Sequence, residues 1–297
     1  MTVQPLQPVA APNEPDHGPS AHAVLREPQR FVPLYRLAQR PSALVGLIIL
    51  VFWVLVAITW PAIVPHWPTD FDFLAKFSAP SSAHWLGADN FGRDVLSRVL
   101  AGSRSVLFIS TSAAVLGVAF GTALGLTAAF YGGLVEEVLM RLMDILMAFP
   151  LIIIALLVIA VLGPSQANVI LVVALAFAPY NARVVRAAGL DQRNKDFVAA
   201  ARLRGESGPY IIVREILPNV SGTILVELTV RLALAIFTVA TLSFLGLGIQ
   251  PPTPDWGLMI AEGRQYYRIA PWIVLFPSLA IASLVIAINL VAEGLKR

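Results

Sequence analysis

The sequence predicts an all-α membrane protein with six transmembrane helices and both termini in the cytoplasm, on three observations. The chain of 297 residues is 57% hydrophobic but only 13% charged, with a mean hydropathy of +0.76, whereas a soluble domain carries about 25% charged residues. Six apolar runs reach the length of about 20 residues that a bilayer requires. Lys and Arg are distributed unevenly between the segments that connect those runs.

The first residues of the chain differ in composition from the rest. Residues 1–34 are rich in Pro, Ala and polar residues and lack the apolar core of a signal peptide. We expect a disordered cytoplasmic tail over 1–34 and a short interfacial helix over 31–39. Residues 35–297 are expected to form one transmembrane domain.

Six spans are expected from the apolar runs, at residues 43–64, 106–130, 137–162, 168–188, 221–245 and 272–292. Pro179 is expected to break the fourth span, because proline removes a backbone donor and clashes with the preceding turn. The long connections are residues 65–105, 189–219 and 247–271.

The positive charges give the orientation. With the N-terminus inside, 14 of the 21 Lys and Arg residues fall in cytoplasmic segments and six in external ones, while Arg231 lies within a span. An excess of Lys and Arg is typical of cytoplasmic loops. We therefore expect the connection 189–219 in the cytoplasm and the connections 65–105 and 247–271 outside.

The second expected span contains three glycines four residues apart, Gly117, Gly121 and Gly125. Small residues at this spacing leave a flat stripe that another helix backbone can approach closely. We interpret the stripe as a packing face, either within this chain or against a partner subunit. Glycine is also common in membrane helices without such a role.

The fifth expected span contains Glu227 and Arg231, whose i, i+4 spacing allows an ion pair along one helix face. Charges at membrane depth are costly and usually face protein or water. We favour a self-neutralising pair near the cytoplasmic end, with the lining of a permeation path as the alternative. Arg141 and Asp144 in the third span are interpreted in the same way.

The two external connections contain features of the membrane surface. From Asp94 onward, apolar and charged residues fall on opposite helical faces, which predicts a helix lying on the outer membrane surface. In 247–271, prolines end the fifth span, and Trp256, Tyr266 and Tyr267 suit an interfacial position. Either connection is suited to dock an external protein or only to cap the bundle.

Motifs of catalytic and metal sites are missing from the sequence. There is no Cys, and none of the three Lys residues follows a Gly, so a P-loop for ATP is absent. The net charge of +3 is too small to indicate nucleic acid. The histidines do not cluster at ligand spacing, so we predict no metal site: they are His17, His22, His66 and His84.

The stretch 199–219, AAARLRGESGPYIIVREILPN, resembles the cytoplasmic "EAA" loop of ABC importer permeases. That loop has the form Glu-Ala-Ala-x-x-x-Gly, then about ten residues, then Ile/Leu-Leu-Pro. Ala200, Ala201 and Gly205 match it, as does the Ile-Leu-Pro at 216–218, whereas Ala199 stands where the family has Glu. The departure at Ala199 puts one contact with the ATPase subunit in question.

Two further stretches narrow the resemblance. HWLGADNFGRDVLSRVLAGSR at 84–104 and TLSFLGLGIQPPTPDWGLMIAEGR at 241–264 are similar to the second permease of dipeptide, oligopeptide and nickel importers, as is the ending NLVAEGLKR. The resemblance runs from about residue 34 to the end of the chain.

The resemblance implies a type I ABC importer permease fold in the bacterial inner membrane. It implies a non-catalytic pore subunit for dipeptides or oligopeptides, with a homologous second permease, two ATPase subunits that hold ATP and Mg, and an external substrate-binding protein. The chain itself is expected to bind no cofactor. The loop 189–219 would carry a coupling helix that contacts an ATPase through Phe197, Ala199, Ala200, Ala201, Arg202, Arg204, Gly205 and Tyr210.

Other functions remain open at this point. The same architecture serves importers of nickel, glutathione or another small solute. A secondary carrier would show inverted repeats and ionisable residues at the membrane midplane. A membrane enzyme would show a catalytic cluster at the spans, and we identify none.

Overall fold

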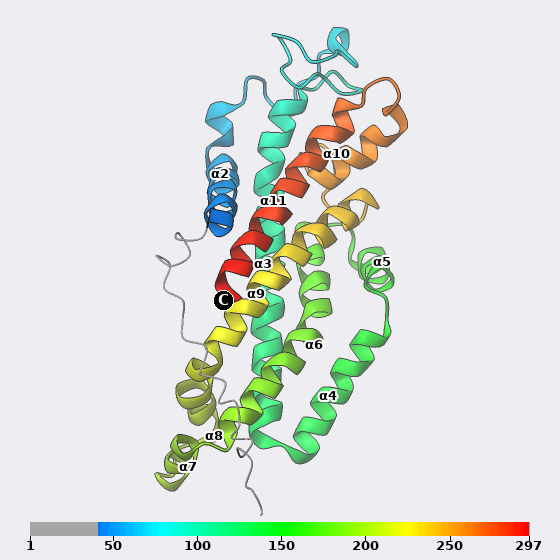
Figure 1. Cartoon of the computed structure of the whole chain (residues 1–297). Helices are drawn as coiled ribbons and strands as arrows, with labels where there is room; N and C mark the ends of the chain where they lie inside the picture. Colours follow the sequence, from blue (N-terminus) through cyan, green and yellow to red (C-terminus); the bar gives the residue numbers. More distant parts are fainter. Residues whose placement is uncertain (1–40, 297) are drawn as a thin grey trace, which may run out of the picture. The chain divides into compact units, whose positions relative to one another are not determined.

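The computed structural model describes residues 41–296, so the tail expected at 1–34 and the helix expected at 31–39 lie outside the described residues. Over the described residues the secondary structure is helical (Figure 1). The longer helices are α2 (Pro41–Ile63), α3 (Val95–Tyr131), α4 (Gly133–Ala148), α5 (Leu151–Leu162), α6 (Gln166–Arg193), α9 (Leu217–Phe244) and α11 (Trp272–Lys296). The shorter elements are η1 (Phe73–Ala75), α7 (Asp196–Leu203), α8 (Gly208–Tyr210), the π-helix η2 (Ile211–Ile216), α10 (Trp256–Gly263) and η3 (Arg264–Tyr266).

The prediction of an all-α membrane fold is confirmed. Five helices are long and apolar enough to cross a bilayer, and α4 with α5 makes a sixth span if the bent pair is counted as one. We name the two ends of the bundle after the short helices that lie there, the α7 end and the α10 end (Figure 1).

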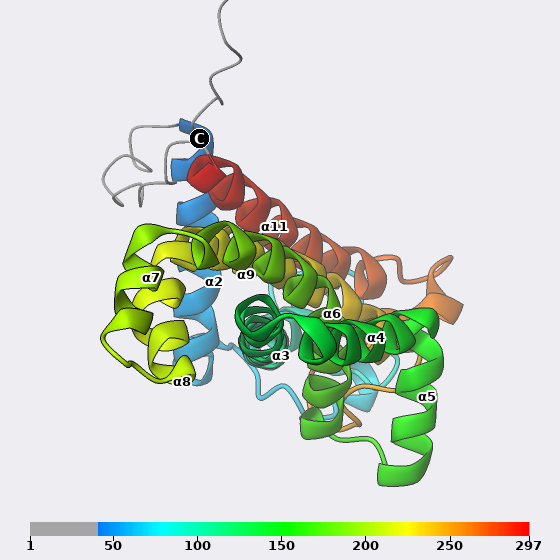
Figure 2. The same cartoon turned by 90° about the horizontal axis from the view of Figure 1, so that it is seen from below.

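The third span differs from the expected straight helix. α4 and α5 are bent by 87° at Phe149, whose extended backbone (φ −97°, ψ 132°) precedes Pro150. Proline disfavours helical backbone in the residue before it, which explains where the helix stops. Seen from below, α5 runs away from the line of α4 (Figure 2).

The expectation that Pro179 breaks the fourth span is wrong. Pro179 lies inside the continuous helix α6, on its buried face. α6 packs along α3, so close helix contact holds the backbone in place although one hydrogen bond is lost.

Two helix boundaries also differ from expectation. The helix expected on the outer membrane surface is the first part of α3, which begins at Val95 after the N-cap Asp94 and continues to Tyr131. Asp94 and Arg98 at its start are buried by other elements rather than facing solvent, whereas Arg104 further along is exposed. The fifth span, expected from residue 221, begins earlier: α9 starts at Leu217 directly after the π-helix η2, with Pro218 in its first turn.

The glycine row of α3 contacts α6 of the same chain. A Cβ on Gly117, Gly121 or Gly125 would lie 2.9, 2.5 or 2.5 Å from the carbonyl oxygens of three alanines of α6. Those alanines, Ala174, Ala178 and Ala182, are themselves four residues apart. Two rows of small residues therefore bring the helix backbones together, and Asn181 adds a hydrogen bond of 2.7 Å to the Val118 carbonyl.

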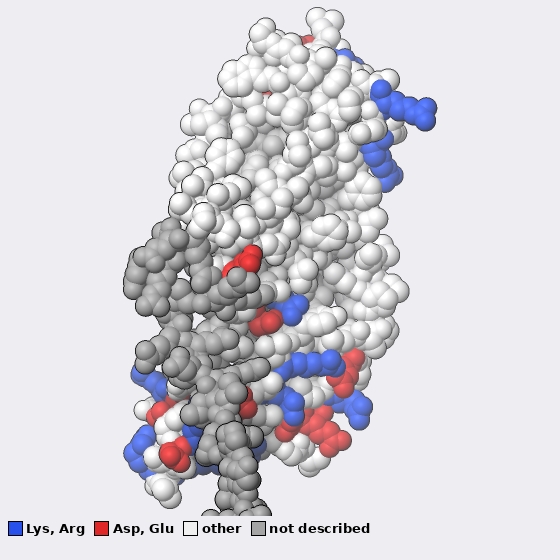
Figure 3. All heavy atoms as spheres, viewed as in Figure 1, with Lys and Arg blue, Asp and Glu red and all other residues white. Residues whose placement is uncertain are grey.

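Three buried apolar clusters succeed one another along the bundle. The first, toward the α10 end, includes Trp53, Trp256 and Leu284, and the second joins α3, α5, α6 and α9. The third lies at the α7 end and includes Phe130 and Ile211. Charged side chains gather on the lower part of the face shown in Figure 3, and the part above is mostly uncharged.

Candidate functional site

The short helix α7 is fixed to the bundle by one side only. Its Val198 and Ala201 are fully buried and join the cluster formed by Phe130 and Ile211, and Phe197 packs against the same cluster. Gly205 ends the helix region with φ +77°, a left-handed conformation that favours glycine. The local sequence thus forms a short helix of eight residues, and the chain changes direction after it.

The other side of α7 is an exposed face that consists of Asp196, Ala199, Ala200 and Leu203. These positions follow i, i+3, i+4 and i+7, the spacing of one helix face. The Leu203 side chain is 90% exposed, whereas the alanines keep the helix surface low beside it. A partner groove can therefore approach the backbone at Ala199 and Ala200 and cover the apolar Leu203.

The burial of α7 concerns two of the expected contact residues. Ala201 is fully buried within this chain, and Phe197 packs against the same cluster with part of its surface open, so both help to position the helix. Leu203 was missed by the motif comparison. The helical period counted from Ala199 and Ala200 would have identified it, because position 203 is the next on that face.

The arginines next to α7 already contact this chain. The guanidinium of Arg202 lies 5.1 Å from the ring centre of Phe130. Arg204 lies 3.3 Å from a Glu215 carboxylate oxygen and 3.8 Å from one of Glu206. The Arg204 side chain is 54% exposed, and ion pairs this accessible contribute little to stability. Both side chains are available to exchange their partners for those of another protein.

The segment after α7 connects it to a long span. Gly208 opens this segment under Tyr131, and a Cβ there would lie 2.6 Å from the Tyr131 hydroxyl. From Gly208 to Phe244 the chain runs as one 37-residue helical span, with Tyr210 exposed near its start. α7 packs on η2, and η2 in turn contacts α9.

Glu227 and Arg231 lie on α9 as an ion pair of 3.0 Å, with side chains only 15% and 13% exposed. The guanidinium also lies 5.2 Å from the ring centre of Tyr180. Arg231 and Tyr180 line a pocket of about 310 Å³ beside the bend between α4 and α5. Arg231 is therefore both neutralised by Glu227 and part of a pocket wall, as each of the two interpretations expects.

The second charged pair expected inside a span is different. Asp144 contacts Arg183 of α6 at 2.5 Å, rather than Arg141. Arg186 of α6 contacts Glu136 of α4 in the same way. These pairs connect α4 to α6.

The α10 end contains a buried network of charges. Arg93 donates from Nε to Asp89 at 2.6 Å and from Nη2 to Glu262 at 2.8 Å. Arg98 lies 3.7 Å from Asp89 and 3.4 Å from Glu262. The side chains of Asp89, Arg93 and Arg98 are at most 4% exposed. The charges of the two arginines are balanced by the two carboxylates, although Nη1 of Arg98 has no hydrogen-bond partner among the described residues.

Asp255 caps α10 from a fully buried position. One carboxylate oxygen accepts from the Leu258 N–H at 3.0 Å, and the other has no partner among the described residues. Burial raises the pKa of Asp255, and the hydrogen bond from the Leu258 N–H opposes this effect.

The statement that the histidines do not cluster needs correction. The rings of His66 and His84 lie 4.9 Å apart, and ligand atoms of both lie within 4.8 Å of one of Asp94. His84 is buried and contacts Asp94 at 3.0 Å, while Asp94 accepts from Ser97 and caps α3. Both oxygens of Asp94 are thus already used, which favours a structural cap over a metal site.

Comparison with known families gives two matches. Residues 121–297 match the family described as the binding-protein-dependent transport system inner membrane component. Residues 33–80 match the N-terminal transmembrane domain of oligopeptide transport permease C.

Individual relatives agree with these matches. A Brucella suis biovar 1 protein whose name assigns it to a peptide transport system permease is 44% identical over 88% of each chain. The dipeptide transport system permease protein DppC of Alkalihalophilus pseudofirmus is 37% identical over 88% of this chain and 86% of its own. The glutathione transport system permease protein GsiD of Escherichia coli O6:K15:H31 is 41% identical, with the same coverage.

Among solved structures, the chain is similar to the inward facing MetNI methionine ABC transporter. The TM-score is 0.50 at 17% identity, over 67% of this chain and 97% of that one. At this identity the similarity concerns the fold alone.

Proposed function

The chain belongs to the family of binding-protein-dependent transport system inner membrane components, and from this premise we propose that it is a pore subunit of an ATP-driven peptide importer. The family consists of multi-pass inner-membrane permeases that are not enzymes, since ATP hydrolysis belongs to separate subunits. Relatives named for peptide and dipeptide transport support peptides as the substrate. The glutathione relative supports a second candidate within the same architecture.

The observation that carries the proposal is the exposed face of α7. Helix α7 buries Val198 and Ala201 and leaves Ala199, Ala200 and Leu203 uncovered. An exposed leucine beside two alanines does not stabilise a surface that faces water. On a coupling helix, the same apolar face would be buried when the helix fits into a groove of an ATPase subunit.

The proposed mechanism follows from the connection between α7 and α9. Closure of two ATPase subunits on ATP would move α7, and the packing on η2 would pass this movement to the span Gly208–Phe244. The ligand that shifts the equilibrium is then a protein that contacts α7 differently in its two states. This assignment puts the α7 end in the cytoplasm and the α10 end outside, as the distribution of Lys and Arg indicates.

The proposal includes the remaining subunits of such a system. A homologous second permease would complete the pore, two ATPase subunits would hold ATP and Mg, and an external binding protein would deliver the substrate. This chain would bind no cofactor of its own.

Cysteine crosslinking tests the proposal. Ala200→Cys is combined with an ATPase subunit that carries Cys in its candidate groove, within the assembled complex. We expect a crosslink whose yield changes with ATP. The matched control is Val198→Cys, two positions earlier on the buried side of α7, where we expect no crosslink. Equal crosslinking at both positions, or none at Ala200→Cys in an assembled complex, would refute α7 as the coupling element and return attention to a secondary carrier.

Transport in proteoliposomes tests the substrate. We expect ATP-dependent uptake of a labelled dipeptide in the presence of the binding protein. Uptake of labelled glutathione or nickel without dipeptide uptake would replace the substrate class and leave the architecture unchanged.

A further inference from the structure

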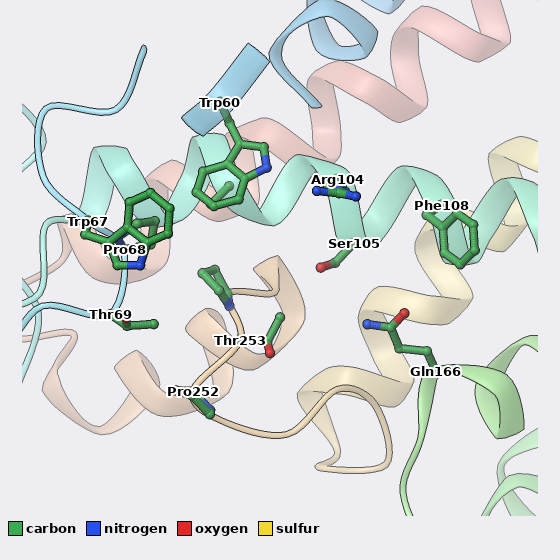
Figure 4. Close-up of a pocket in the computed structure, with 12 residues that line it drawn as sticks. Trp60, Trp67, Pro68, Thr69, Arg104, Ser105, Phe108, Gln166, Pro252 and Thr253 are labelled. Carbon is green, nitrogen blue, oxygen red and sulfur yellow. The ribbon is translucent and has the colours of Figure 1, made fainter. Parts of the chain in front are cut away.

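A pocket of about 450 Å³ opens at the start of α3, away from the α7 end (Figure 4). Its walls come from five parts of the chain: Trp60 of α2, Trp67 after it, Arg104 of α3, Gln166 of α6, and the segment before α10. The volume falls within the range of about 300–1,000 Å³ that is typical of small-molecule sites.

Arg104 is the charged residue of this pocket, and its charge is not compensated. It makes no hydrogen bond or ion pair with the residues that the structure describes, and no Asp or Glu is among the described residues that line the pocket. This differs from Arg93 and Arg98, which are paired with carboxylates only a few turns away. A guanidinium without a carboxylate offers a fork of donors that fits a carboxylate with two parallel hydrogen bonds.

The walls around Arg104 are aromatic. The rings of Trp60 and Trp67 lie 5.4 Å apart and are tilted by 45°, and Phe108 lies one helical turn beyond Arg104 on the same side of α3. The indole nitrogen of Trp60 has no hydrogen-bond partner among the described residues, and Figure 4 draws it on the edge of the ring nearer to Arg104. The Arg104 guanidinium and the Trp60 indole nitrogen, two donors without partners among the described residues, therefore lie next to aromatic rings.

Polar side chains also line the pocket beside Arg104 and Phe108 (Figure 4). Ser105 and Gln166 extend into it in Figure 4, from α3 and from the first residue of α6. Such groups can exchange hydrogen bonds with amide groups. The combination suits a small molecule that has one carboxylate, apolar side chains and an amide, which describes a short peptide.

We propose that this pocket is a peptide subsite in which Arg104 binds the C-terminal carboxylate while Trp60, Trp67 and Phe108 contact the side chains. The inference rests on the proposed function, which places the pocket on the outer side, where the binding protein releases its cargo. The subsite would hold the peptide as it enters the pore and would favour peptides with a free C-terminus.

Equilibrium binding tests the subsite in the complete importer, reconstituted in nanodiscs without binding protein and without ATP. The probes are a labelled apolar dipeptide and its C-terminal amide. We expect the amide to bind about 10–100-fold more weakly, which is the effect of losing hydrogen bonds to a charged group. Arg104→Gln is expected to weaken dipeptide binding to the level of the amide, with little effect on the amide itself.

The matched control is Arg268→Gln, which removes one exposed arginine near α10 that does not line the pocket. We expect it to bind the dipeptide like the unmodified importer. Basal ATP hydrolysis is expected to stay unchanged in both variants, which shows that each complex is assembled.

Several results would overturn the subsite. These are equal binding of dipeptide and amide, no binding of either, or unchanged dipeptide binding in Arg104→Gln. Binding that depends on phosphatidylglycerol in the nanodisc would show that the pocket holds a lipid headgroup instead. Loss of stimulation by the binding protein with intact peptide binding would assign Arg104 to docking.

A transport assay with the binding protein and ATP distinguishes failure of the subsite from failure of the proposed function. If the unmodified importer transports the dipeptide with ATP but does not distinguish it from the amide in the nanodisc, only the subsite is wrong. If it transports no peptide at all, the proposed function is wrong.

Discussion

The two ends of the bundle use their charges in opposite ways. At the α10 end, Asp89, Arg93 and Arg98 are at most 4% exposed and form ion pairs with one another and with Glu262. At the α7 end, Arg204 is 54% exposed, and its ion pairs with Glu206 and Glu215 lie at the surface. A closed network gives a fixed shape, whereas exposed pairs can be exchanged. The α10 end therefore holds these charges inside the chain, whereas the α7 end presents its charges at the surface, as our proposal of a docking face on α7 requires.

The largest expected effect on stability comes from opening the closed network. Asp89→Asn keeps the size of the side chain but leaves Arg93 and Arg98 with a single carboxylate between them. Removing one partner of a buried charge network costs about 3–5 kcal/mol, which we expect to see in denaturant unfolding in detergent micelles. Glu215→Gln at the α7 end is the control and should cost about 0–1 kcal/mol. Similar losses for both variants would remove the difference between the ends.

A smaller loss of stability is expected when the packing of α3 on α6 is disturbed. Gly121→Ala would place a Cβ 2.5 Å from the Ala178 carbonyl oxygen, so α3 and α6 must move apart. Overpacking of this kind costs about 1–3 kcal/mol, measured by the same unfolding experiment. Ala119→Leu, which adds a larger side chain to an exposed position of α3, is expected to change little. An unperturbed Gly121→Ala variant would show that the helices tolerate separation.

The contribution of Asp255 to stability is expected to depend on pH. The raised pKa of Asp255 means that the folded state keeps a proton that the unfolded state releases, so this residue favours folding at low pH and less so as pH rises through the raised pKa. Asp255→Asn retains a cap without the charge. Its thermal midpoint should exceed that of the unmodified protein by about 2–4 °C at pH 8, and the difference should shrink toward pH 4. Identical pH profiles would contradict this, and the exposed cap Asp72→Asn serves as the control.

The smallest effect on stability is expected at the α7 end, with a clear effect on transport. Leu203→Ala removes a side chain that is 90% exposed, so unfolding should change by less than about 0.5 kcal/mol. ATP-driven peptide uptake is expected to fall about tenfold, as for an anchor residue of an interface. Leu203→Met keeps the apolar contact and should transport normally. Unchanged uptake in Leu203→Ala would show that the exposed face of α7 has no partner.

The sequence predicts the spans well because hydrophobicity is a property of each segment alone. It does not predict which proline changes the helix path, because that depends on neighbours. Pro179 is buried on α6 against α3, whose contact keeps the helix straight. Pro150 is exposed and lacks such support, so the extended backbone at Phe149 persists and the span bends.

The sequence predicts the part of the candidate site that depends on local spacing, but not the part that depends on distant neighbours. The motif located α7, and helical spacing separates its buried Ala201 from the exposed Ala199 and Ala200. The partners of Arg93 could not be foreseen, since Glu262 lies 169 residues away. The charged residues from Asp94 onward predict the polar face of a surface helix, and only the tertiary structure shows that Asp94 and Arg98 are buried.

The bend between α4 and α5 has a consequence for the surroundings of the chain in the membrane. Helix breaks expose carbonyl and amide groups, and a lipid environment offers them no hydrogen bonds, so such breaks are stable only against protein or a water-filled space. Phe149 at the bend is 56% exposed, so this chain does not cover the break by itself. The bend therefore restricts what can surround α4 and α5 at membrane depth to protein or a water-filled space, and disfavours direct contact with lipid tails.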